Sequence, residues 1–158
     1  MGVVVKSRQT VFEAGVFKLE TEHVTLENGV DTRIHLLRHP GASAIVPMLD
    51  PRTVVLISQY RHALGRFVWE VPAGTLHGLQ EDPLECARRE LLEETGYRGG
   101  RFEKLGAINP SPGYSDECIH VFLATDLAAD RQNLDRDEVL RVHVTPFDQA
   151  LEMARDGE

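Results

Sequence analysis

The clearest structural signal in this chain of 158 residues is one helix with both of its ends marked. Asp82 is a favourable N-cap residue, Pro83 suits the first helical position, and Glu85 completes a start similar to a capping box. Gly96 supplies the C-terminal stop. The sequence therefore predicts a helix over residues 82–95.

This helix divides into an apolar stripe and an acidic stripe at 3.6 residues per turn. Glu90, Glu93 and Glu94 fall on an arc of about 100°, although each like-charged pair costs a helix a few tenths of a kcal/mol. The cluster also lies near the helix C-terminus, where the macrodipole disfavours negative charge. Clustered carboxylates of this kind suit a divalent cation such as Mg²⁺, and the alternative is a solvated acidic face. Beside them, an arc of about 80° is predicted to face the core: Leu84, Ala87, Leu91 and Thr95.

Apolar runs on both sides of the helix predict strands. A second amphipathic helix is expected to begin at Thr145 or Pro146 and to run through Ala154. On the strand before it, Leu140, Val142 and Val144 are predicted to share one face. Strands interleaved with two helices indicate a mixed α/β domain. The predicted strands cover residues 17–20, 23–26, 32–38, 44–48, 53–57, 67–71, 102–107, 118–124 and 140–144.

Charge and composition exclude several classes of protein. The net charge of -8 argues against duplex nucleic acid as a partner. No apolar run approaches the ~18 residues of a membrane span, and the first residues lack a secretory signal. The two cysteines cannot form a disulfide scaffold, and Cys86 and Cys118 are expected to be core residues. We therefore expect a cytoplasmic protein without membrane or nucleic-acid partners.

The segment from Gly74 to Tyr97 resembles the Nudix box. That box reads Gly, five residues, Glu, seven residues, Arg-Glu, an aliphatic residue, any residue, Glu-Glu, any residue, Gly and an aliphatic or aromatic residue. One departure is that six residues separate Gly74 from Glu81. The resemblance implies the Nudix α/β/α sandwich with a mixed sheet, over residues 41–158. The matching positions are Gly74, Glu81, Arg89, Glu90, Leu91, Glu93, Glu94, Gly96 and Tyr97.

Nudix hydrolases cleave a nucleoside diphosphate linked to another group, with Mg²⁺ or Mn²⁺ held by the box glutamates. The resemblance implies that Glu90 and Glu94 are the principal metal ligands. Glu93 is implied as a further ligand or as the group that orients the attacking water. The backbone carbonyl of Ala73 is an expected additional ligand, and Arg89 is expected to orient Glu93.

The proton of the attacking water must be taken by a carboxylate. In this family the general base often comes from an acidic loop after the box, which here covers residues 133–138. Glu138 matches the family position best, and Asp137 is the fallback. The alternative for Glu138 is a solvated loop acid. Glu93, Glu94 and Glu138 are therefore the catalytic candidates.

Motifs outside the box resemble the ADP-ribose pyrophosphatase branch of the family. These motifs are residues 39–41, 59–61, 69–74 and 111–117, so the resemblance extends from about Arg33 to Val142. They imply substrate contacts of three kinds. Arginines are candidates for phosphate or ribose, a strand-end glutamate for adenine or ribose, and the later loop for the terminal sugar. The alternatives are that the arginines are ordinary surface residues and that Glu70 simply pairs with Arg61. The substrate-binding candidates are Arg33, Arg61, Glu70, Ser111, Gly113 and Glu117.

The expected function is divalent-metal-dependent hydrolysis of ADP-ribose or a related nucleoside diphosphate sugar to a nucleoside monophosphate and a sugar phosphate. Other nucleotide substrates remain open, namely GDP-mannose, FAD or a dinucleoside polyphosphate, as does a non-catalytic nucleotide-sensing Nudix domain. Residues 1–40 are expected to form a small N-terminal β-sheet with an open edge. Relatives in this branch are commonly homodimers, so this sheet is the expected dimerisation element.

Overall fold

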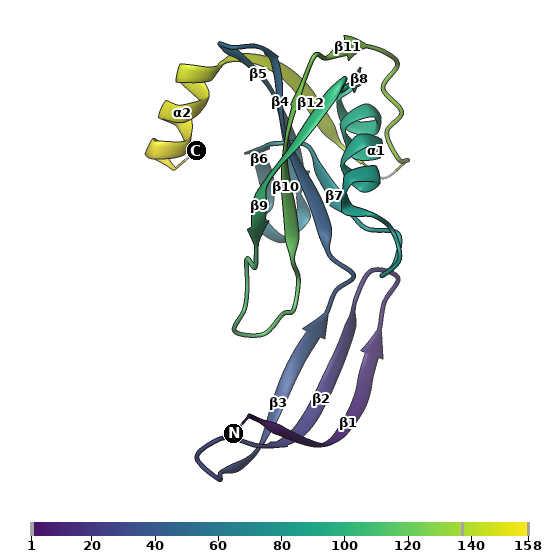
Figure 1. Ribbon diagram of the computed structural model, residues 1–158, viewed down its shortest axis with the longest axis vertical. Coiled ribbons are helices and arrows are strands. Elements are labelled where there is room, and N and C mark those ends of the chain that lie inside the picture. Colours follow the sequence, from purple (N-terminus) through teal and green to yellow (C-terminus); the bar gives the residue numbers. More distant parts are fainter. Residues whose placement is uncertain (1, 137, 158) are drawn as a thin grey trace.

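The computed structural model describes residues 2–136 and 138–157 (Figure 1). It contains the mixed α/β architecture that the sequence predicts. The elements are β1 (Val4–Glu13), β2 (Lys18–Thr25), β3 (Asp31–Arg38), β4 (Ala42–Asp50), β5 (Thr53–Arg61), a 3-10 turn (His62–Leu64), β6 (Arg66–Glu70), β7 (Ala73–Thr75), α1 (Pro83–Thr95), β8 (Tyr97–Arg98), β9 (Arg101–Ile108), β10 (Ile119–Thr125), β11 (Ala128–Ala129), β12 (Leu140–Pro146) and α2 (Phe147–Asp156).

The first three strands form a separate antiparallel sheet with β2 in its centre. The sequence predicted two strands where the structure has the single strand β2. The ladder continues through Glu22 because two arginines neutralise this buried carboxylate. Strand β1 has no apolar alternation in its sequence, and all ten of its residues are exposed. Figure 1 shows this sheet extending away from the rest of the chain.

The larger sheet contains the strand order β12-β5-β4-β10-β9, with β6 paired to β5 and β7 paired to β4. Strands β10 and β4 are parallel and the other pairs are antiparallel, so the sheet is mixed, as predicted. Figure 1 shows α1 and α2 on opposite sides of this sheet, which is the expected α/β/α sandwich. On β12 the predicted face is only half-buried at Leu140 and Val142, and Val144 is exposed.

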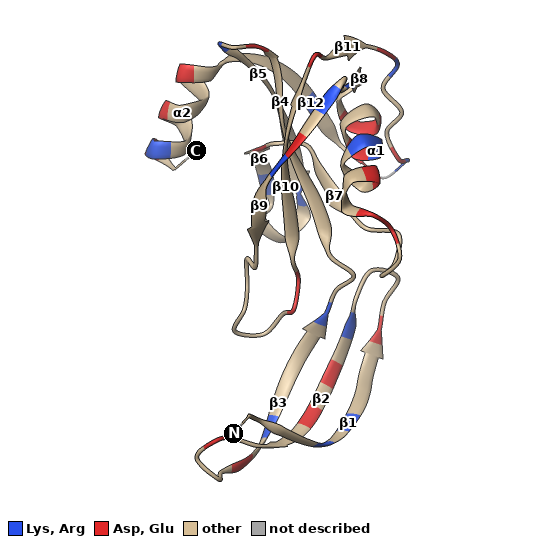
Figure 2. Cartoon of the chain, viewed as in Figure 1, with Lys and Arg blue, Asp and Glu red and all other residues tan. Residues whose placement is uncertain are grey.

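Helix α1 begins and ends where the sequence predicts. The Asp82 side chain accepts a hydrogen bond from the Leu84 amide at 2.8 Å, and Gly96 adopts the left-handed conformation with φ of 72°. The apolar stripe of the helix packs on β4 and β10, with Thr95 buried beside it. The core cluster consists of Ile45, Ala87, Leu91, Phe122 and Ala124, with Leu84 packed against it. Figure 2 shows the acidic positions of α1 in red.

The loop between β9 and β10 joins the larger sheet to the N-terminal sheet. The Leu37 amide donates to the Tyr114 carbonyl at 2.7 Å, and the Asp116 amide donates to the Leu37 carbonyl at 3.2 Å. These contacts place the end of β3 beside the loop. Among the described residues, neither helix has the length and apolar character that crossing a membrane requires.

Candidate active site

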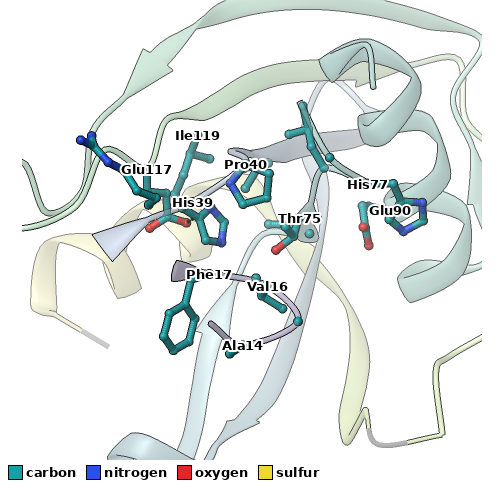
Figure 3. Close-up of a pocket in the computed structure, with 18 of the residues that line it drawn as sticks. Ala14, Val16, Phe17, His39, Pro40, Thr75, His77, Glu90, Glu117 and Ile119 are labelled. Atoms are coloured by element: carbon teal, nitrogen blue, oxygen red, sulfur yellow. Dashed lines mark ion pairs between the residues drawn. The ribbon is translucent and has the colours of Figure 1, made fainter. Parts of the chain in front are cut away.

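A cavity of about 1530 Å³ lies between the N-terminal sheet and the larger sheet. Its walls come from the β1–β2 turn, the β3–β4 connection, β7 with the loop after it, and the acidic stripe of α1. Segments distant in sequence therefore converge on one space. The residues labelled in Figure 3 are Ala14, Val16, Phe17, His39, Pro40, Thr75, His77, Glu90, Glu117 and Ile119.

The three glutamates that the helical periodicity placed together all line this cavity. Glu90 and Glu94 are 7% and 1% exposed, whereas Glu93 lies at the more open edge. Burial raises the pKa of Glu90, and it raises the pKa of Glu94 to about 8. A solvated acidic face would leave these carboxylates in water, so the structure contradicts that alternative for Glu90 and Glu94.

Arg89 is the cation within this cluster. One guanidinium nitrogen, Nη1, lies 2.5 Å from Glu90 Oε1 and 3.2 Å from Glu93 Oε2. The same guanidinium lies 3.3 Å from Glu81, and the carboxylates of Glu81 and Glu90 raise the pKa of Arg89. The expected contact with Glu93 is present, and Arg89 additionally holds two further glutamates in place.

Glu94 is anchored through β7. Its Oε2 accepts a hydrogen bond from the Ala73 amide at 2.9 Å. The Ala73 carbonyl is an expected metal ligand, and in the structure the amide of this residue contacts the glutamate. The Glu94 carboxylate is therefore oriented by backbone as well as by its place on α1.

The acidic loop after the box also reaches the cavity. Glu138 lines it, and the Glu138 Oε2 accepts a hydrogen bond from the Asp135 amide at 2.9 Å. Its negative charge contributes to the raised pKa values of Glu90 and Glu94. The fallback candidate Asp137 lies outside the described residues.

Arg61 and Glu70 lie in the same cavity and pair with each other. The Arg61 Nε donates to Glu70 Oε1 at 2.8 Å, and a second bond joins Nη2 to Oε2. The Glu70 carboxylate raises the pKa of Arg61, with smaller contributions from Glu94 and Glu138. This pair provides a fixed guanidinium within the electrostatic reach of the glutamate cluster.

The remaining substrate-binding candidates are divided between two places. Glu117 lines the cavity, where its Oε1 lies 3.7 Å from His39 Nδ1. Ser111 and Gly113 are not among the residues that line it, and the Ser111 carbonyl instead closes a turn with the Tyr114 amide at 3.1 Å. Arg33 lies on the N-terminal sheet at a separate, smaller hollow. Sequence motifs cannot show this separation because they carry no information on which way a loop or strand faces.

Comparisons with known proteins agree with this geometry. The model of the NUDIX domain family matches residues 38–158. The chain belongs to the Nudix family. It is 36% identical to the ADP-ribose pyrophosphatase of Bacillus subtilis over 154 residues, which is 96% of this chain and 83% of that protein.

Two further proteins are similar to this chain. The chain is 38% identical to the GDP-mannose pyrophosphatase of Escherichia coli over 131 residues, which is 77% of this chain and 67% of that protein. A solved structure described as an ADP compounds hydrolase superposes with a TM-score of 0.84 at 22% identity, covering 99% of this chain and 84% of the other. The last comparison supports the fold alone.

Two positions of the Nudix box have structural roles that the sequence analysis did not assign. A Cβ atom added at Gly74 would lie 2.1 Å from the Cδ and Oε1 atoms of Glu90, so only glycine leaves room for this carboxylate. Glu81 accepts a hydrogen bond from the His77 amide at 2.5 Å and pairs with Arg89. The extra residue before Glu81 therefore leaves its contacts to the helix intact. The fixed box positions of both residues were the signal that could have identified these roles.

Nudix hydrolases generally use divalent metal ions, and the donor chemistry of the cavity fits such an ion. Glu90, Glu93 and Glu94 each commit one oxygen to a protein donor: Arg89 for the first two and the Ala73 amide for the third. Within the described residues their other oxygens, Glu90 Oε2, Glu93 Oε1 and Glu94 Oε1, accept no hydrogen bond. Hard oxygen donors are what Mg²⁺ prefers. Over residues 2–136 and 138–157, no three acidic, histidine or cysteine side chains already converge as a metal-binding group.

Proposed function

We propose that this protein hydrolyses the pyrophosphate bond of ADP-ribose or a related nucleoside diphosphate sugar, with a divalent ion as cofactor. The observation that carries the proposal is the set of buried glutamates that share a cavity with the Arg61–Glu70 pair. The similarity to the Bacillus subtilis ADP-ribose pyrophosphatase supports the choice of substrate. The products would be a nucleoside monophosphate and a sugar phosphate.

The chemistry follows from the groups around the cavity. When bound, a divalent ion neutralises the pyrophosphate and lowers the pKa of a water molecule. Glu90, Glu93 and Glu94 would hold the ion, and Arg61 would contact a phosphate oxygen. Glu138 would accept the proton of the attacking water. The new bond joins the water oxygen to phosphorus, and the bond that breaks joins the same phosphorus to the bridging oxygen.

A substrate panel with purified protein tests this proposal. We expect ADP-ribose with Mg²⁺ to yield AMP and ribose 5-phosphate, and we expect excess EDTA to abolish the reaction. Replacement of Glu93 by Gln should lower kcat by orders of magnitude, whereas the exposed Glu85→Gln variant of the same helix should match wild type. Turnover that persists in EDTA, or a Glu93→Gln variant with wild-type kcat, would refute the proposed reaction.

A second candidate substrate is GDP-mannose, because the Escherichia coli relative is named for it. The ratio of kcat/KM for ADP-ribose and GDP-mannose discriminates between the two. FAD and dinucleoside polyphosphates belong in the same panel. A nucleotide sensor without catalysis is disfavoured because Glu90, Glu93 and Glu94 are all retained; it would bind nucleotides without releasing products.

We propose Mg²⁺ as the physiological ion and Mn²⁺ as a substitute, because carboxylate oxygens with room for water and phosphate suit both.

The proposed location is the cytoplasm. Both cysteines are free, and burial raises the pKa of Cys86 to about 11, which makes its thiol unreactive. Fractionation of the native source tests the location, and recovery with secreted proteins would contradict it.

We propose that residues 1–40 form a dimerisation element of a homodimer, with the Nudix domain in residues 41–158. The support is the outer edge of β1, which pairs with no strand in the described part of the chain, and its exposed apolar side chains, Val4, Val11 and Phe12. Light scattering after gel filtration should give twice the mass of the chain. A Val11→Lys variant should shift the mass toward a monomer, and an unchanged monomer mass for wild type would contradict the proposal.

A further inference from the structure

Arg38, the last residue of β3, connects the N-terminal sheet to the β9–β10 loop. The Arg38 Nε donates to Glu20 Oε2 at 3.0 Å, and its Nη2 donates to Glu22 Oε1 at 2.7 Å. Its remaining nitrogen, Nη1, donates to Asp116 Oδ2 at 3.1 Å. The planar guanidinium thus contacts three carboxylates in three directions, which a lysine ammonium on a flexible stem cannot reproduce.

The two glutamates require cations because they are buried. Glu20 and Glu22 are 9% and 6% exposed on the face of β2. Arg8 of β1 also pairs with both, at 3.3 Å from Glu20 Oε2 and 2.6 Å from Glu22 Oε1. Arg8 and Arg38 therefore share the neutralisation of this pair, and removing either leaves the carboxylates with one partner.

Only Arg38 extends this network to the loop. Among the described residues Arg8 pairs with Glu20 and Glu22 and makes no ion pair with Asp116. The second oxygen of Asp116, Oδ1, accepts a hydrogen bond from the His39 amide at 2.9 Å. Asp116 is therefore held at both oxygens, one by the Arg38 side chain and one by the backbone that leads into β4.

The position of this aspartate decides the position of the cavity wall. The next residue, Glu117, lines the cavity, and its carbonyl accepts a hydrogen bond from Asn109 Nδ2 at 2.7 Å across the base of the loop. Asp116 itself also lines the cavity. A shift of Asp116 relative to β3 would thus move Glu117 and the wall against which a substrate rests.

We propose that Arg38 is a positioning residue for the substrate: by clamping Asp116 to the N-terminal sheet, it holds Glu117 and the 109–117 loop in place for the terminal-sugar half of the nucleotide. This inference rests on the proposed function, and it takes Glu117, the terminal-sugar candidate that lines the cavity, as the contact to the sugar half. All three guanidinium nitrogens of Arg38 are committed to carboxylates, so in this proposal it acts through Asp116 and not on the reacting atoms. Its loss should therefore weaken binding of the sugar half without altering the chemical step.

The test compares three variants in the full chain with Mg²⁺. Arg38→Met removes the clamp, Arg38→Lys keeps the charge without the three-way geometry, and Arg8→Met is the matched control that leaves Asp116 clamped. Both Arg38 variants should raise KM for ADP-ribose by about tenfold or more, with kcat within about threefold of wild type. The inhibition constant of AMP, which lacks the terminal ribose, should stay unchanged. Arg8→Met should keep the wild-type KM.

Several outcomes would overturn the inference. A wild-type KM in Arg38→Lys, an equal rise of KM in Arg8→Met, or a fall of kcat at constant KM would each contradict it. If Arg38→Met does not fold, Arg38→Lys and Asp116→Asn replace it, and the same rise of KM is expected for both. If wild type turns over no nucleotide sugar, the proposed function fails instead. In that case hydrogen exchange tests the clamp. Loss of amide protection in residues 109–117 in Arg38→Lys, with protection retained in Arg8→Met, would support it. Equal protection of these amides in the two variants would overturn it.

Discussion

The burial of Glu94 predicts that the metal-free protein loses stability as pH rises. Burial raises the pKa of this carboxyl from 4.5 to about 8, so the folded chain holds a proton that the unfolded chain has released at neutral pH. The contribution of this carboxyl to the free energy of unfolding is therefore largest below pH 4.5, and it falls until the pH passes about 8. The two pKa values differ by an amount worth roughly 5 kcal/mol.

Replacement of Glu94 by Gln removes this titration while keeping an oxygen that can accept the Ala73 hydrogen bond. We expect the variant to exceed wild type by about 2–5 kcal/mol at pH 8.5 in EDTA, and to differ little at pH 5. Some pH dependence should remain in the variant because burial also raises the pKa of Glu90.

The assay is urea unfolding at fixed pH between 5 and 9, followed by the fluorescence of Trp69, the only tryptophan. Glu85→Gln on the exposed side of α1 is the control, and its profile should follow wild type. A Glu94→Gln profile parallel to wild type across this range would refute the electrostatic reasoning. Added Mg²⁺ should stabilise wild type most at high pH, because a bound ion balances the ionised carboxylate.

Three further predictions concern the elements that build the site. Gly74→Ala should keep the fold but lower activity by about tenfold or more, because the new Cβ displaces the Glu90 carboxylate; circular dichroism with a rate assay checks this, and wild-type turnover would contradict it. Asp82→Ala should cost about 1 kcal/mol in urea unfolding through loss of the helix cap, whereas an unchanged midpoint would mean that the cap contributes nothing. In the native protein, a thiol reagent at pH 8 should modify the partly exposed Cys118 and spare Cys86 until urea is added, and rapid native modification of Cys86 would contradict its raised pKa.

Local signals in the sequence were sufficient for α1 and for its acidic stripe. Helical periodicity alone assigned Leu91 to the core and Glu94 to the acidic stripe beside it, and both residues lie where it predicted. The cap residues Asp82 and Gly96 set the helix ends because capping depends on neighbours in sequence. Contacts with distant parts of the chain add only the burial of Glu94, which raises the pKa of its carboxyl.

Features that depend on distant parts of the chain could not be predicted in this way. The motif around Ser111 implied a substrate contact, but the structure places Ser111 and Arg33 outside the cavity. The sequence of strand β1 has no apolar alternation, so only its pairing with β2 reveals it. The role of Gly74 likewise depends on a side chain sixteen positions later, which approaches it only in the folded chain.

The claim that the glutamates of α1 serve a divalent ion is tested most directly by a Mn²⁺ titration followed by electron paramagnetic resonance. We expect wild type to remove free Mn²⁺ from solution and to release it when Mg²⁺ is added in excess. The double variant Glu90→Gln/Glu94→Gln should leave the Mn²⁺ signal free at the same protein concentration, provided its circular dichroism matches wild type. Equal Mn²⁺ binding by wild type and by this folded variant would contradict the account.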